Sequence, residues 1–244
     1  MKLLFFVLIL PFFSFTITPQ EAVLLGDKIW KNECRGTLDG LLHWNVGEEF
    51  LSLGIGHFIW YPEGYQGPFE ETFPALLQFL EKESVDLPDW LRKKTAPWVN
   101  RKEFLDKKDA EEAVFLRKML FETRGLQALF IAKRLETAIS QIDEKNPAYK
   151  NLQKFLKDPK GLYALIDYAN FKGTGLRASE AYQNQGWGLI QVLEGIPDSS
   201  TNLLADFVKE SKRLLQKRVE NAPKERGEER WLKGWFNRLD TYLE

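Results

Sequence analysis

The stretch from Ile29 to His57 constrains the fold most. It contains the end of a predicted helix, and small and apolar residues alternate in the part that follows. The helix start is marked by Thr18 as a cap, Pro19 at the first helical position and Glu21 as the partner in a capping box. Apolar residues then recur at helical spacing, and Gly36 is a natural stop. The sequence therefore predicts a helix that begins after Thr18 and ends at Gly36.

Glu33 lies in the last turn of this predicted helix and continues the apolar stripe of Ala22, Leu25 and Ile29. Its side chain should therefore project near the buried face. Desolvation and the negative end of the helix dipole would both raise the pKa of Glu33 there. A general acid needs a carboxyl that keeps its proton near neutral pH. The alternative is a helix-end glutamate that reaches solvent.

The alternation that follows predicts one β-strand from Glu48 to Gly56. Leu51, Leu53 and Ile55 share its core face. The other face carries Glu48, Phe50, Ser52, Gly54 and Gly56. Glycines inside a strand usually mark the close approach of a ligand or of another backbone, so this face should leave room for a sugar ring. A β-bulge would turn the side chain of Glu49, rather than that of Glu48, toward this face of the strand.

Together these residues resemble a known family. Glu33 near a helix end, followed by a hairpin that closes on SLGIGH (52–57), is similar to the phage-type lysozymes of the lysozyme-like superfamily. ALIDYANFKGTG (164–175) is similar to the buried helix and glycine turn of that fold. GWGLIQV (186–192) resembles the GLMQ stretch of lytic transglycosylases. The whole chain looks like a group of exported proteobacterial proteins with this fold.

The resemblance implies that Glu33 is the general acid and that Ser52 stands where a threonine helps to hold the attacking water. Phage-type enzymes place an aspartate six residues before that threonine, and this chain has Val46 there. The second carboxylate is then Glu48, or failing that Glu49 or Asp39. If none of them serves, the enzyme works with Glu33 alone, as lytic transglycosylases do.

Further substrate contacts are expected from Glu49, His57, Tyr182 and Gln191. The resemblance implies that Tyr182 and Gln191 line the cleft across from Glu33, although ordinary packing is the alternative for both. His57 follows the glycine strand and is expected to hold the hairpin in place by a hydrogen bond rather than to perform chemistry. The aromatic loop after it, FIWYPEGYQGPF, either lines a glycan cleft or packs the hairpin onto the helical body.

Residues 1–18 read as a secretory signal peptide, with one lysine and an apolar run that Pro11 interrupts. We expect a single lysozyme-like domain over 19–244 that is periplasmic or secreted, with no membrane span after signal removal. The fold class is mainly α (α+β), with a small β-hairpin lining a cleft. Apolar residues at helical spacing predict helices over 69–83, 100–122, 124–144, 161–171, 201–221 and 227–242.

The composition of the chain argues against several kinds of site and partner. A single cysteine excludes an internal disulfide, and two histidines without ligand spacing suggest no metal site and no cofactor. The formal net charge of −1 disfavours nucleic acid and gives no electrostatic steering toward anionic cell walls. The sequence thus predicts an exported peptidoglycan glycosidase, either a muramidase or a lytic transglycosylase, that cleaves the MurNAc–GlcNAc bond. The alternative is an inactive lysozyme-like envelope protein that binds glycan or acts as a scaffold.

Overall fold

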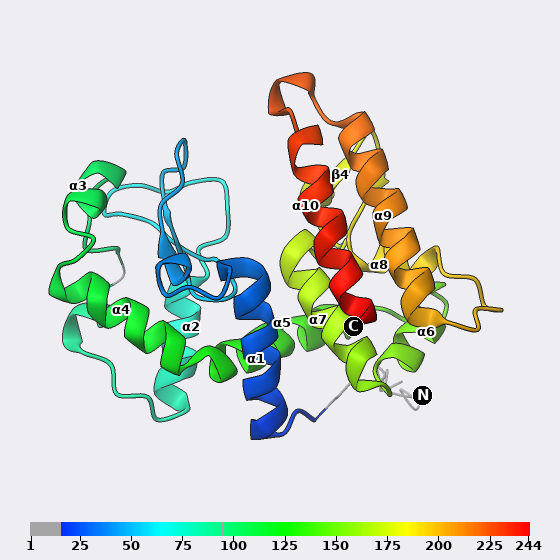
Figure 1. Ribbon diagram of the computed structural model, residues 1–244, viewed down its shortest axis with the longest axis horizontal. Coiled ribbons are helices and arrows are strands. Elements are labelled where there is room, and N and C mark those ends of the chain that lie inside the picture. Colours follow the sequence, from blue (N-terminus) through cyan, green and yellow to red (C-terminus); the bar gives the residue numbers. More distant parts are fainter. Residues whose placement is uncertain (1–15, 94) are drawn as a thin grey trace, which may run out of the picture. The chain divides into compact units, whose positions relative to one another are not determined.

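The helical character of the chain is plain in a computed structural model, which describes residues 16–93 and 95–244 (Figure 1). Helices make up 59% and strands 6% of the structure, so the predicted mainly α class with a small antiparallel sheet is confirmed. The predicted signal peptide lies, up to residue 15, outside the described residues. In the described parts of the chain, no helix is both long and apolar enough to cross a bilayer.

The single domain expected over 19–244 divides into two compact units. The first comprises residues 17–132 and the second residues 133–244. The division falls within a continuous helix, α5 (Arg124–Ile139). No proline- or glycine-rich linker marks it, which is why composition did not reveal it.

The first unit combines helices with the larger sheet. Its elements are α1 (Pro19–Cys34), η1 (Asp39–Leu41), β1 (Leu42–His43), β2 (Leu51–Leu53), β3 (Phe58–Trp60), α2 (Phe73–Lys82), η2 (Asp89–Arg92), α3 (Arg101–Asp106), α4 (Glu111–Glu122) and the first part of α5. The predicted capping box is present: the Thr18 hydroxyl accepts from the Glu21 N–H at 3.2 Å, and the Glu21 carboxylate accepts from the Thr18 N–H at 2.8 Å.

The sheet of the first unit is antiparallel in the order β1–β2–β3. Ser52 on the central strand lies opposite His43 on one side and Ile59 on the other. All three residues of β2 are buried, so neither of its faces is open. The strand predicted over 48–56 is therefore too long, because the chain turns at Gly54, whose φ of +67° ends the strand.

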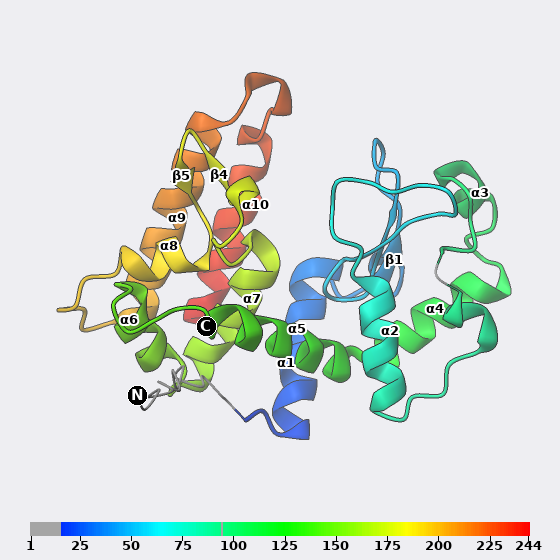
Figure 2. The same cartoon turned by 180° about the vertical axis from the view of Figure 1, so that it is seen from behind.

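The second unit is built from helices and one short hairpin. Its elements are the rest of α5, α6 (Ala148–Phe155), α7 (Pro159–Lys172), η3 (Ala178–Glu180), β4 (Ala181–Tyr182), β5 (Gln185–Gly186), α8 (Leu189–Glu194), α9 (Leu203–Asn221), η4 (Lys224–Arg226), α10 (Glu229–Asp240) and η5 (Thr241–Leu243). The β4–β5 hairpin lies beside α9 (Figure 2).

Helix α7 is the buried centre of the second unit, as its all-round apolar sequence predicts. Its Asp167 is fully buried and accepts from the Arg238 guanidinium at 2.8 and 2.9 Å and from the Tyr242 hydroxyl at 2.5 Å. Burial, reinforced by the charge of Asp167, raises the pKa of Tyr242 well above its usual range. A buried carboxylate with these partners ties α7 to the end of the chain.

Candidate functional site

Glu33 lies where α1 ends. The helix stops at Cys34 because Arg35 and Gly36 both take left-handed φ angles, of 54° and 63°. The predicted apolar stripe on α1 is buried, down to full burial of Ile29. The Glu33 side chain continues the stripe and is only 11% exposed. A carboxyl group is therefore held close to the core at the end of a helix.

His57 lies beside Glu33, with its Nδ1 3.8 Å from the Glu33 Oε2. His57 closes the turn that follows β2, and its N–H donates to the Gly54 carbonyl at 3.3 Å. Its φ of 47° is left-handed, a strained conformation for a non-glycine residue. Within the described chain, its buried Nε2 has no hydrogen-bond partner.

A second imidazole, His43 on β1, packs edge-on against His57 with ring centroids 4.9 Å apart. Its Nδ1 lies 3.3 Å from the Gly40 carbonyl, and because a carbonyl only accepts, this nitrogen must be the protonated one. Burial, and secondarily the charge of His57, lower the pKa of His43 to about 4. His43 is therefore neutral at physiological pH, with the lone pair on Nε2.

Glu48 lies in the turn before β2, not on the strand where it was predicted. The Asn45 amide donates to its Oε2 at 3.0 Å, and the Trp44 indole N–H donates to its backbone carbonyl at 2.7 Å. Burial raises the pKa of Glu48, while the Asn45 hydrogen bond and the charge of His57 oppose that rise. His57 therefore interacts electrostatically with Glu48 as well as with Glu33.

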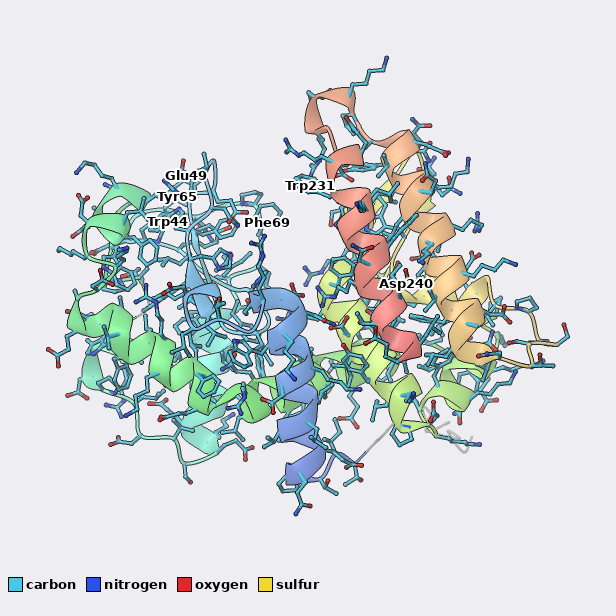
Figure 3. All side chains as sticks on the ribbon, in the orientation of Figure 1. Trp44, Glu49, Tyr65, Phe69, Trp231 and Asp240 are labelled. Atoms are coloured by element: carbon cyan, nitrogen blue, oxygen red, sulfur yellow. The ribbon has the colours of Figure 1, made fainter. Side chains whose placement is uncertain are left out.

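The other candidates for a second carboxylate lie in solvent. Glu49 is exposed, and Figure 3 labels it. Asp39 begins η1 with 90% of its side chain exposed, 3.1 Å from the Arg117 guanidinium. Ser52, predicted to position water, is only 4% exposed and lies between its neighbouring strands.

The space predicted beside the glycines is filled. A Cβ on Gly54 would lie 2.2 Å from the Gln127 Oε1, and one on Gly56 would lie 2.4 Å from the Phe58 ring. The prediction that these two glycines leave room for a sugar ring is therefore wrong, because protein side chains occupy the positions next to them.

Sequence reasoning missed Gln127. Its side chain is fully buried, and its Oε1 accepts from the Ile55 N–H at 3.0 Å. The available signal was its spacing: Gln127 lies four residues after Thr123, the C-cap of α4, and four residues before Ile131 on α5, and both of these residues are buried. A polar residue on a buried stripe needs partners, and here the partner is the turn that carries His57.

Tyr182 and Gln191 belong to the second unit and make internal contacts there. The Tyr182 hydroxyl donates to the buried Glu228 carboxylate at 3.0 Å. The Gln191 Oε1 accepts from the Gly188 N–H at 3.1 Å, and its Nε2 donates to the Gly175 carbonyl at 3.3 Å. That they also line a cleft across from Glu33 stays a prediction.

The aromatic loop after β3 is held together by Tyr61. Its hydroxyl lies 3.3 Å from both the N–H and the carbonyl of Phe69, and its ring packs against Phe50 at 5.6 Å. Tyr65 and Phe69 remain 43% and 59% exposed, and Figure 3 labels both. The loop thus combines a packed base with two exposed rings.

Over residues 16–93 and 95–244, no three His, Cys, Asp or Glu side chains gather in a way that could hold a metal ion. No known protein family, curated protein or solved structure matches the chain.

Proposed function

We propose that this protein is an exported, lysozyme-like peptidoglycan glycosidase that cleaves the MurNAc–GlcNAc bond with Glu33 as the general acid. One observation carries the proposal: the Glu33 side chain, in the last helical turn, is only 11% exposed and lies beside His57 in the same unit. The resemblance of the 29–57 segment to phage-type lysozymes gives that carboxyl its role.

The Glu33–His57 pair suits proton delivery. A protonated Glu33 carboxyl is uncharged, and burial favours the uncharged form of a carboxyl group. Glu33 can then protonate the leaving glycosidic oxygen as the sugar develops oxocarbenium character. His57 stabilises the carboxylate that remains after proton transfer.

Two routes complete the reaction. In the first, Glu48 acts as a base on water, and its raised pKa makes it a better base than an ordinary carboxylate. An inverting enzyme places its two carboxyls about 6.5–9.5 Å apart and a retaining one about 5–5.5 Å. In the second, the 6-hydroxyl of muramic acid attacks its own anomeric carbon and gives an anhydro product without water.

The test is turnover of purified sacculi by the mature protein. Glu33→Gln should lower the rate by about 10²–10⁴-fold, as expected for loss of a general acid, with an unchanged melting temperature. Glu122→Gln is the matched control because its side chain is 60% exposed and has no role in the proposed reaction, and it should keep full activity. Mass analysis of the products separates hydrolysis from the anhydro route. Full activity in Glu33→Gln would remove Glu33 from the mechanism.

A non-catalytic role is the second candidate. The filled space at Gly54 and Gly56 and the burial of Ser52 favour it, because they leave less room for water and sugar than a hydrolase needs. In that case wild-type protein should pellet with sacculi and release no soluble fragments. Any Glu33-dependent product would exclude this role.

A further inference from the structure

We infer that Gln127 is a positioning residue that clamps the Gly54–His57 turn and so sets His57 against Glu33. The inference concerns the geometry of the pair, and only its activity readout depends on the proposed glycosidase function. The turn and the clamp lie in the same compact unit.

Every polar atom of the Gln127 amide is used. Its Oε1 accepts from the Ile55 N–H at 3.0 Å, and its Nε2 donates to the Leu120 carbonyl at 2.6 Å and to the Thr123 hydroxyl at 3.0 Å. The side chain is fully buried. The amide therefore links the junction of α4 and α5 to a turn that lies 72 residues away in sequence.

Gly54 permits this link. A side chain there would overlap the Gln127 Oε1, and its φ of +67° is one that glycine adopts without strain. The Gly54 N–H donates to the Leu41 carbonyl at 2.7 Å, and its carbonyl accepts from the Cys34 thiol at 3.8 Å. Since Cys34 follows Glu33 directly, the turn is anchored beside the residue that it serves.

The position of His57 follows from these anchors. Its strained backbone persists only where the surroundings hold it, and its N–H closes the turn onto the Gly54 carbonyl. Removing the Gln127 acceptor would leave the Ile55 N–H unpaired in the core. The turn would then rearrange to find another partner, and His57 would move away from both Glu33 and His43.

Two substitutions test the clamp. Gln127→Met keeps the length of the side chain and removes all three hydrogen bonds. Gln127→Glu keeps an acceptor for the Ile55 N–H but disturbs donation to Leu120. The matched control is Asn151→Leu in the second unit, because Asn151 is a buried amide that donates to the Leu193 and Ile196 carbonyls at 2.9 Å each.

The first readout needs no activity. The chain has only two histidines, so its imidazole NMR spectrum holds two spin systems, and the 4.9 Å ring separation should give a nuclear Overhauser contact between them. Gln127→Met should lose that contact, whereas Gln127→Glu and Asn151→Leu should keep it. Persistence of the contact in a folded Gln127→Met protein would overturn the inference, as would its loss in Asn151→Leu.

The second readout is sacculus turnover. A displacement of about 1 Å at a reacting group can cost on the order of a hundredfold in rate, so Gln127→Met should fall by that factor and Gln127→Glu by much less. Absence of turnover in the wild type would refute the glycosidase proposal and leave the NMR result to decide the clamp. Normal turnover in Gln127→Met together with a retained contact between the two imidazoles would refute the clamp and leave the glycosidase proposal standing.

Discussion

Gly54 meets two demands at once, a left-handed backbone and contact with a buried amide. Gly54→Ala should therefore lose about 2–6 kcal/mol of unfolding free energy, from backbone strain of about 1–3 kcal/mol and from displaced hydrogen bonds of about 1–3 kcal/mol. Gly64→Ala is the matched control, because Gly64 has a φ of +77° and no atom within 4 Å of an added Cβ. Urea unfolding measures both, and equal losses would show that packing against Gln127 contributes nothing.

At single residues, the sequence predicted what depends on local spacing. The burial of Glu33 followed from its place after Ala22, Leu25 and Ile29. The contact of Glu33 with His57 could not be predicted in this way, because His57 reaches Glu33 through a left-handed turn that no sequence period encodes. The role of Gln127 was not predicted for a related reason: its hydrogen bond to Ile55 joins residues 72 positions apart in the sequence.

Among the elements, α7 and α10 are joined by a buried ion pair whose loss should be costly. Asp167→Asn leaves the Arg238 guanidinium, itself 9% exposed, without its charge partner. Removing the charge of one partner of a buried ion pair typically lowers the free energy of unfolding by about 3–5 kcal/mol. Asp240→Asn on α10, the helix that carries Arg238, is the control, since Asp240 pairs with Lys212 at 53% exposure and surface pairs are worth about 0–1 kcal/mol. Similar melting temperatures for the two variants would contradict the structural role of Asp167.

Element boundaries were predictable where side chains cap helices. The Thr18 side chain accepts from the Glu21 N–H as predicted, and the Asn100 side chain accepts from the Glu103 N–H at the start of the helix predicted from residue 100, so α1 and α3 begin where the sequence places them. The β4–β5 hairpin was missed because its turn uses Gln183 and Asn184 at positive φ rather than a glycine pair. The strand over 48–56 was overextended because alternation alone does not reveal a turn at a glycine.

For the molecule as a whole, the division into two units had no compositional signal, because it falls within α5 rather than in a proline- or glycine-rich segment. The fold class could be predicted because helical periodicity dominates the chain. The contacts within each unit could not, since they depend on packing between distant segments. The pair formed by Asp167 and Arg238, 71 residues apart, is an example.

Net charge gives a prediction at the same scale. A formal charge of −1 over the full chain provides no long-range attraction to an anionic wall, so binding to sacculi should depend on short-range contacts. Between about 0.01 M and about 1 M salt the Debye length falls from about 30 Å to about 3 Å. The pelleted fraction of Glu33→Gln protein, which leaves the sacculi intact, should therefore change by less than about twofold, whereas a strongly basic wall-binding protein in the same assay should be released. Release of this protein by salt would mean that a local cationic surface, and not the near-zero net charge of the chain, governs its binding to sacculi.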